Sequence, residues 1–400
     1  MKTSNIKLFL FIFYFSCSGL KYYCQKAKEI SLINSTFLGT EGRNYYGNSA
    51  PDSLNKIWEY YLGKGKTTIS RNLGEREWAG AGWTGQPLLV QEGDTLFIIQ
   101  GCYDHNLKKI NAETGKLVWN YKFDDVVKGT GTIWHFKNAP NLEQSFIIFQ
   151  GSRLGYGKFL DTKHVPSYRA ISYITGKELW RLDVKMTDSY SRDVDGSCLM
   201  HDDTLYIGLE NGLFTVIDPK PSSGENKNGM FQPKILSESI LYEKKDIANH
   251  RKNLVTESSP SKIGDHMYIA SGSGHVYGYN LKKDSIDWDF YIGSDIDGSA
   301  IVTNDSCLLI SVEKQYIKGN GGVFKINPRK KPSECVEWYY PVEGTKISSW
   351  EGGIIGSVGV NINGNQNGNL AAFIDVNGKL NIVEHDKINN EKIVLGPNRT

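Results

Sequence analysis

Residues Ile110–Phe123 read INAETGKLVWNYKF and have the pattern of a β-hairpin. An apolar residue ends one strand, and the polar stretch from Asn111 to Lys116 predicts a turn. Gly115 can adopt positive φ, and the side chains of Asn111 and Thr114 can hydrogen-bond the local backbone. The run LVWNYKF then mixes β-branched and aromatic residues, which suit a pleated, half-buried surface. The stretch therefore predicts two strands joined by a tight turn.

The same pattern recurs along the chain at a constant interval. The Thr-Gly-Lys-x-x-Trp motif of Thr114 to Trp119 returns at Thr175 to Trp180, and Trp58, Trp119 and Trp180 are each 61 residues apart. A period of about 45 to 60 residues, with four short strands per period and no helical periodicity, indicates a β-propeller. We therefore predict an all-β propeller of about six to eight four-stranded blades, in one domain over residues 56–400. Two β-sandwiches are the alternative, but sandwiches do not repeat this motif.

Six sets of strand-like runs align on this pattern, so six blades are explicit in the sequence. Their approximate ranges are 85–123, 145–184, 193–243, 256–288, 295–338 and 353–386. The third set is interrupted by an insertion, and its outer strand is predicted at 240–243. A seventh blade could lie in the insertion at 219–240 or in the tail. Residues 25–55 are predicted to be a polar lead-in without a core pattern.

The N-terminus has the composition of an export signal. Lys2 and Lys7 are basic, and Leu8 to Phe15 are eight unbroken apolar residues, a run too short to span a bilayer. Residues 1–24 are therefore predicted to be a signal peptide, which implies a periplasmic, outer-membrane-anchored or extracellular protein. Cys17 offers an alternative to ordinary cleavage, namely lipid attachment to a mature N-terminal cysteine. Such a lipid would be the protein's attachment to a membrane.

Charge and cysteine content argue against several classes of function. The chain has 46 basic and 44 acidic side chains, so no global field attracts nucleic acid. The cysteines other than Cys17 have no CxxC spacing, which argues against a cysteine zinc site and a disulfide framework. Cys102, Cys198 and Cys307 lie in strand-like runs, where a thiol behaves as a small apolar side chain.

The repeated motif, preceded by alternating strands such as GHVYGYN at Gly274–Asn280, resembles the pyrroloquinoline-quinone-like (PQQ-like) repeat. That family includes quinoprotein alcohol dehydrogenases and the propeller lipoprotein of the bacterial outer-membrane barrel-assembly machine. The resemblance covers roughly Lys56 to Asp386 and is sharpest in the two Thr-Gly-Lys-x-x-Trp motifs. It implies that a strand around Trp58 pairs with the last blade and closes the ring.

The resemblance does not bring quinone chemistry with it. The motifs that supply the bases and calcium ligands of those dehydrogenases are not identifiable in this sequence. The sequence also has neither an adjacent cysteine pair nor a haem CxxCH motif. PQQ is therefore not expected as a cofactor, and a quinoprotein oxidoreductase is the least favoured reading.

Aligning the starts of the innermost strands predicts a ring of acidic residues. The aligned starts are Thr84-Gly85-Gln86, Thr130-Gly131-Thr132, Asp195-Gly196-Ser197, Glu257-Ser258-Ser259, Asp297-Gly298-Ser299 and Glu351-Gly352-Gly353. Four consecutive blades then present an acid at the mouth of the central channel: Asp195, Glu257, Asp297 and Glu351. Loops that open on the same face are expected to add further candidate ligand-binding residues, namely His105, His250, Arg251 and His275.

Like charges that converge in one channel cost free energy unless something neutralises them. The acids could bind a cation, and Ca²⁺ suits an oxygen-only set with Asp195 and Asp297 as its ligands. They could instead pair with Arg251, Arg153 and the histidines in a site for a protein or carbohydrate ligand. In a third reading, the acids cap the strand starts by accepting backbone N–H groups and bind no ligand.

The leading hypothesis is an exported propeller that acts as a non-catalytic binding or scaffold protein through the loop face at its channel. The rival is a secreted enzyme that cleaves an acidic polysaccharide by elimination. In that enzyme Arg251 would stabilise the substrate carboxylate, and His105, His250 or His275 would take the proton. The sequence has no nucleophile motif, phosphate loop or metal-binding helix, so catalytic residues are not assigned.

Overall fold

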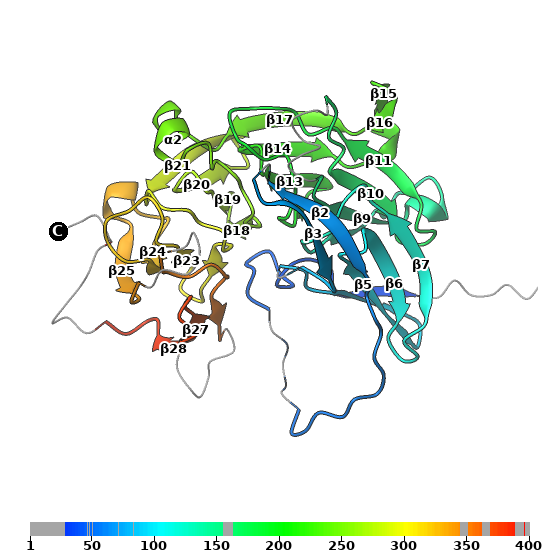
Figure 1. Ribbon diagram of the computed structural model, residues 1–400, viewed down its shortest axis with the longest axis horizontal. Coiled ribbons are helices and arrows are strands. Elements are labelled where there is room, and N and C mark those ends of the chain that lie inside the picture. Colours follow the sequence, from blue (N-terminus) through cyan, green and yellow to red (C-terminus); the bar gives the residue numbers. More distant parts are fainter. Residues whose placement is uncertain are drawn as a thin grey trace, which may run out of the picture.

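The computed structural model describes residues 29–45, 47, 49, 51–70, 72–82, 84–154, 163–344, 351–361, 369–388 and 396. Within them the chain is almost entirely β-structure, and six antiparallel sheets follow one another around an arc in chain order (Figure 1). The predicted all-β propeller is thereby confirmed. Cys17 and the predicted signal peptide lie outside the described residues. In the part of the chain that is described, no helix is long and apolar enough to cross a membrane.

Each of the six sheets forms one blade, and the first strand of each blade lies nearest the channel. The first sheet has an additional strand, β1 (Ile30–Asn34), on its inner edge. Blades 1 to 3 consist of β4 (Leu88–Glu92), β5 (Thr95–Gly101), β6 (Asn106–Asn111) and β7 (Leu117–Lys122); β8 (Thr132–His135), β9 (Phe146–Gly151), β10 (Tyr168–Ser172) and β11 (Glu178–Leu182); and β12 (Leu199–His201), β13 (Thr204–Leu209), β14 (Leu213–Asp218) and β17 (Lys234–Ile240). Blades 4 to 6 consist of β18 (Ser261–Ile263), β19 (His266–Ala270), β20 (His275–Asn280) and β21 (Ser285–Tyr291); β22 (Ile301–Val302), β23 (Leu308–Val312), β24 (Gly322–Ile326) and β25 (Val336–Pro341); and β26 (Gly359–Val360), β27 (Leu370–Ile374) and β28 (Leu380–Glu384).

The remaining elements decorate this ring. They are β2 (Lys64–Ser70), β3 (Gly74–Ala79), β15 (Glu225–Lys227), β16 (Met230–Gln232), α2 (Lys244–Asn249) and the 3₁₀ turns η1 (Leu142–Gln144), η2 (Pro221–Ser223) and η3 (Pro332–Glu334). The insertion in blade 3 folds as the β15–β16 hairpin and adds no further blade. The outer strand of that blade is β17, which ends at Ile240, so the strand predicted at 240–243 lies too late in the sequence.

Burial along each blade follows from the face-to-face packing of neighbouring sheets. Middle strands are covered on both faces, so β9 (FIIFQG) and β24 (GVFKI) are buried throughout. The outermost strand β7 alternates between exposed and half-buried residues because it lies at the rim. Five hydrophobic clusters connect the six blades, and each draws side chains from two neighbours. The core of the protein is therefore a series of interfaces between blades.

The tryptophan at the end of the repeated motif docks on the turn of the following blade. Trp119 Nε1 donates to Tyr173 O at 3.1 Å, and Trp180 Nε1 donates to Pro219 O at 2.9 Å. The turn has a glycine of positive φ where the indole approaches, and a Cβ on Gly176 would lie 2.8 Å from Trp119. The equivalent bonds in later blades, both at 3.0 Å, are Trp288 Nε1 to Lys330 O and Trp338 Nε1 to His385 O.

The predicted closure by a strand around Trp58 needs correction. Residues 51–63 form no strand, yet Trp58 Nε1 donates to Ala112 O at 2.7 Å and its indole lies against Gly115. Trp58 thus contacts blade 1 in the way that Trp119 contacts blade 2, without any backbone pairing. The docking contact requires only an indole and a turn, whereas a strand requires a free sheet edge at hydrogen-bonding distance.

The N-terminal segment, residues 30–44, connects the first and last blades (blue in Figure 1). Ile30 and Leu32 pack against the cluster between blades 1 and 2, and Leu38 packs against the cluster between blades 5 and 6. Its strand β1 pairs with β4 of blade 1. Backbone bonds to blades 2, 4 and 5 also hold the segment: Ile133 N to Ser35 O, Lys262 N to Glu41 O and Val302 N to Gly42 O. Part of the predicted lead-in therefore lies inside the ring.

Candidate functional site

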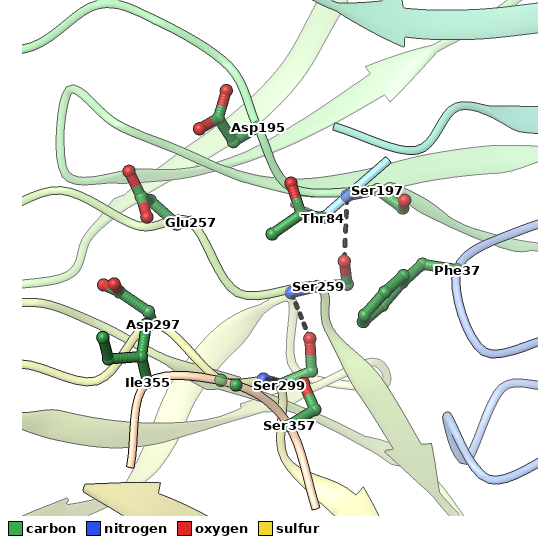
Figure 2. Close-up of a pocket in the computed structure, with 12 residues that line it drawn as sticks. Phe37, Thr84, Asp195, Ser197, Glu257, Ser259, Asp297, Ser299, Ile355 and Ser357 are labelled. Atoms are coloured by element: carbon green, nitrogen blue, oxygen red, sulfur yellow. Dashed lines mark hydrogen bonds between the residues drawn. The ribbon is translucent and has the colours of Figure 1, made fainter. Parts of the chain in front are cut away.

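A ladder of serine hydroxyls fixes how the blades align at the channel. Ser197 N donates to Ser259 Oγ at 2.9 Å, and Ser259 N donates to Ser299 Oγ at 2.8 Å (Figure 2). Ser299 N donates in turn to Ser357 Oγ at 2.9 Å. Each bond crosses from one blade to the next, so the four serines occupy equivalent positions in blades 3 to 6.

Three of the four predicted acids come together on this ladder. Asp195, Glu257 and Asp297 each stand two residues before a serine of the ladder, and they line one side of a cavity of about 80 Å³ (Figure 2). Phe37 of the N-terminal segment lines the opposite side. Among the described residues, no backbone N–H donates to these three carboxyl groups, so they do not serve as strand caps.

Glu351 does not join the other three acids, and its predicted position is corrected. Its side chain is exposed, and the residue two positions before Ser357 is Ile355. The alignment on Glu351-Gly352-Gly353 was four residues too early, because the register is set by the hydroxyl of Ser357 and not by the preceding glycines. Blade 6 therefore contributes an apolar side chain to the ring.

The sequence prediction missed Lys128, which holds the same position in blade 2. Gln86 N donates to Thr130 Oγ1 at 2.7 Å, which extends the ladder to blades 1 and 2. Lys128 stands two residues before Thr130, and its ammonium contacts Asp195 and lies 3.8 Å from Glu257 Oε1. The tripeptide Lys128-Gly129-Thr130 has the same pattern as Asp195-Gly196-Ser197, a charged residue followed by glycine and a hydroxyl residue, and could have identified this position. A Cβ on Gly129 would lie 2.0 Å from Asp195 O, so the close approach of two blades requires glycine there.

Further buried carboxyl groups surround this ring. Asp193 pairs with Arg153 at 2.9 Å, whereas the other three acids accept hydrogen bonds from neutral side chains: Glu210 from Ser191, Asp295 from Asn253 and Glu313 from Gln315. Within the described residues, Asp195 Oδ1 and Glu210 Oε1 have no hydrogen-bond partner. In this part of the described structure, seven carboxyl groups lie near three basic side chains: Lys128 and Arg153, which are ion-paired, and Arg251, which lines the adjoining cavity. Acid is therefore in excess.

This excess perturbs the titration of the acids. Burial and the neighbouring carboxylates raise the pKa of Glu257 and of Asp297 to about 8, and that of Asp295 to about 7. Burial and Asp297 raise the pKa of Glu313 to about 11, and the two side chains are hydrogen-bonded to each other. A proton shared by two carboxyl groups replaces a countercharge. The ring therefore gains negative charge above neutral pH.

A wider cavity of about 580 Å³ adjoins the ring on the loop face and shares Glu257, Asp297 and Ile355 with the smaller one. Its other lining residues are Lys128, Tyr190, His250, Arg251, Asn253, Val255, Asp295, Gln315 and Tyr316. The His250 ring packs on the Tyr316 ring at 4.5 Å between centroids, and burial lowers the pKa of His250. The site thus combines a carboxyl-lined floor with walls of aromatic and amide side chains and the two basic groups of Lys128 and Arg251.

The remaining predicted residues occupy other places. His105 lies under the β2–β3 hairpin, where its Nε2 is 3.0 Å from Lys66 O, and His275 is bonded to Asp246 and Asp289. Neither lines the channel cavities described above. Of the constellation predicted for polysaccharide elimination, the cavity therefore contains Arg251 and one histidine, His250, whereas His105 and His275 lie elsewhere. Ca²⁺ binding at Asp195 and Asp297 stays a prediction, and an ion there would have to displace Lys128 from Asp195.

Comparisons with known proteins identify the family of the chain. No curated protein matches the chain. A solved structure of BamB from Moraxella catarrhalis is 12% identical with a TM-score of 0.48, over 74% of this chain and 72% of that chain. A structure of U3-55K is 11% identical with a TM-score of 0.43, over 72% of this chain and 73% of that one. A family model described as outer membrane protein assembly factor BamB matches residues 55–290, more than half of the chain. The chain therefore belongs to this family of PQQ-like propellers.

Proposed function

We propose that this protein is a non-catalytic binding or scaffold propeller whose loop-face cavity holds a cationic segment of a partner protein. The observation that carries the proposal is the excess of buried carboxyl groups around Asp195, Glu257 and Asp297, with Lys128 and Arg153 as the basic residues that contact them. An arginine or lysine side chain would supply the missing countercharge. Its binding would lower the pKa values of the ring and release protons.

The walls of the cavity suit the same ligand. Tyr190 and Tyr316 are 44% and 41% exposed and line the cavity above the acids. Aromatic faces attract guanidinium and ammonium groups, and the attraction grows when water is excluded. An acidic polysaccharide would meet like charge on the floor of the cavity, which argues against the lyase alternative.

The proposal places the protein outside the cytoplasm. The family model describes an outer-membrane assembly factor, and the N-terminus has basic residues followed by the apolar run from Leu8 to Phe15. We infer export to the periplasm, with Cys17 as the residue that would carry a lipid anchor. Labelling of the expressed protein with a radioactive fatty acid, in the wild type and in Cys17→Ser, tests the anchor. Equal labelling of the wild type and the variant would show that Cys17 is not the lipid attachment site.

Peptide binding tests the proposed ligand class. A fluorescein-labelled nonapeptide with three arginines, and its counterpart with three glutamates, are titrated at pH 8 and followed by fluorescence anisotropy. The wild type should bind the basic peptide at least about tenfold more tightly, and Asp295→Asn/Asp297→Asn should remove that preference. Glu351→Gln is the matched control, because it removes an exposed acid outside the cavity. Equal binding of both peptides, or an unchanged preference in the double variant, would overturn the proposal.

A further inference from the structure

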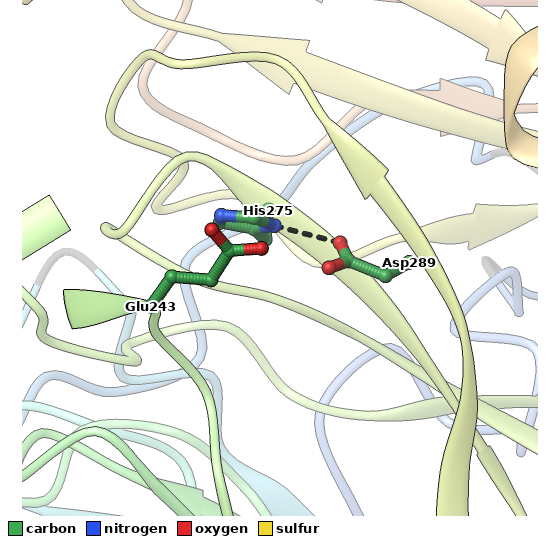
Figure 3. A group of neighbouring side chains, drawn as sticks. All are labelled: Glu243, His275 and Asp289. Atoms are coloured by element: carbon green, nitrogen blue, oxygen red, sulfur yellow. Dashed lines mark hydrogen bonds and ion pairs between the residues drawn. The ribbon is translucent and has the colours of Figure 1, made fainter. Parts of the chain in front are cut away.

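A second group of ligating side chains lies outside the channel, between blades 3 and 4. Glu243 directly precedes α2, His275 begins β20, and Asp289 lies on the neighbouring strand β21 (Figure 3). One donor atom from each of these three residues lies within 4.8 Å of the others. His275 Nδ1 is 2.6 Å from Asp289 Oδ1. An imidazole nitrogen and two carboxylate oxygens therefore converge on one point.

The opposite nitrogen of the imidazole is fixed by a buried acid. His275 Nε2 donates to Asp246 Oδ2 at 3.2 Å, and the same oxygen accepts from Glu243 N at 2.7 Å. His275 and Asp246 are fully buried. The rings of Tyr277 and Tyr291 pack against the imidazole, with 5.0 and 4.6 Å between the ring centroids. A carboxylate that accepts from one ring nitrogen while the other faces a metal is the common outer-shell arrangement of metal-binding histidines.

The geometry points to a Zn²⁺ site formed by His275 Nδ1, Asp289 and Glu243, with a fourth position open to water. In the metal-free protein the 2.6 Å contact requires a proton on Nδ1, because the Asp289 carboxylate only accepts. Zn²⁺ takes the place of that proton. A mixed set of one nitrogen and two oxygens suits Zn²⁺, whereas Ca²⁺ takes oxygen ligands only and more of them. The site is independent of the channel and of the function proposed for it.

A competing cation occupies part of this site. Lys245 Nζ lies 2.7 Å from Glu243 Oε2 and 4.8 Å from the centre of the Tyr291 ring. Its side chain is 51% exposed, so it can move into solvent when a metal binds. Removing this ammonium should therefore strengthen metal binding, a result that a purely structural role of Glu243 does not produce.

Zn²⁺ titration of the full chain, treated first with a chelator, tests the inference by isothermal calorimetry. One Zn²⁺ per chain should bind, and Glu243→Gln and Asp289→Asn should each weaken it at least about tenfold. Lys245→Ala should bind more tightly, and Ca²⁺ should give no comparable heat. In the wild type, Co²⁺ should show visible absorption bands that are lost in Asp289→Asn.

The controls keep a folding defect apart from a lost ligand. Glu243 and Asp289 are 50% and 35% exposed, so their amide variants should keep the wild-type melting temperature without metal. Glu210→Gln alters the other group of three carboxylates, in the channel, and should leave Zn²⁺ binding unchanged. The inference is overturned by the absence of Zn²⁺ binding, by equal affinity in Glu243→Gln and Asp289→Asn, or by loss of binding only in Glu210→Gln.

Discussion

Arg43 is the residue on which the centre of the ring depends most. Its guanidinium is fully buried and donates to Thr36 Oγ1 at 2.7 Å and to the carbonyl oxygens of Phe37 and Pro260, both at 2.8 Å. A further bond of 3.1 Å reaches Cys198 O. Burial lowers the pKa of Arg43 to about 10, so it stays charged at neutral pH. One side chain thus ties the N-terminal segment to blades 3 and 4.

Replacement of Arg43 should therefore be costly. Arg43→Met leaves several buried carbonyl groups without a donor, and we expect a loss of at least about 3 kcal/mol in the free energy of unfolding. Urea denaturation followed by tryptophan fluorescence measures it. Arg76→Met, on the exposed face of β3, is the control and should cost less than about 0.5 kcal/mol. Similar losses for the two variants would contradict the role of Arg43.

Individual site residues were only partly predictable from the sequence. Asp195, Glu257 and Asp297 were found because each stands at a fixed offset from a serine. Lys128 was missed because the alignment of blade 2 was two residues late, and Glu351 was wrongly included because that of blade 6 was four residues early. The innermost strands are too short to fix a register alone, since β22 and β26 have two residues each. The register is fixed by hydrogen bonds between neighbouring blades, and these bonds cannot be read from the local sequence of one blade.

At the scale of the element, the repeated hairpin connects one blade to the next. The turn glycine provides a surface on which the preceding indole rests, and the indole N–H satisfies a carbonyl of the same turn. This explains why turn and tryptophan recur together, and why the motif predicted the fold. The prediction of a strand around Trp58 was wrong, because a tryptophan that only docks on the turn of the next blade gives the same sequence pattern as one that ends a strand.

Alanine at the turn glycine tests this docking. In Gly176→Ala the new Cβ meets positive φ (+70°) and lies 2.8 Å from Trp119. In Gly264→Ala the φ is +57° and no atom lies within 4 Å. We expect about 1 kcal/mol of destabilisation for Gly264→Ala from backbone strain, and about 2–3 kcal/mol for Gly176→Ala. Equal values by urea denaturation would mean that the indole contact contributes nothing.

At the scale of the whole molecule, the N-terminal segment could not be predicted. Its few apolar residues show no repeated core pattern, and its decisive contacts reach residues far along the chain, such as Pro260, which is 217 residues from Arg43. Single-sequence periodicity reports which face of an element is buried but not which distant element covers it. The order of the six described blades was predictable because each repeats the same pattern, whereas that pattern left the exact number open between six and eight.

The channel acids make global stability depend on pH. Glu257 and Asp297 keep their protons up to about pH 8 in the native protein. In the unfolded chain such groups ionise near pH 4. The native state therefore binds more protons between these values, so stability falls as the pH rises from about 4 to about 8 and changes little above that. The melting temperature should drop by several degrees from pH 6 to pH 9. The melting temperature of Asp297→Asn should drop less over the same range. An equal drop in the wild type and the variant would contradict the raised pKa of Asp297.

The pH dependence of ligand binding tests the central claim most directly, namely that the channel carboxyl groups receive a cationic ligand. The triarginine peptide is titrated into the wild type and into Asp297→Asn at pH 6 and at pH 8.5, at constant ionic strength. The wild type should bind several-fold more tightly at pH 8.5, because Glu257 and Asp297 are then ionised, and the variant should show a smaller gain. An affinity that is independent of pH, or a gain of equal size in Asp297→Asn, would contradict the claim.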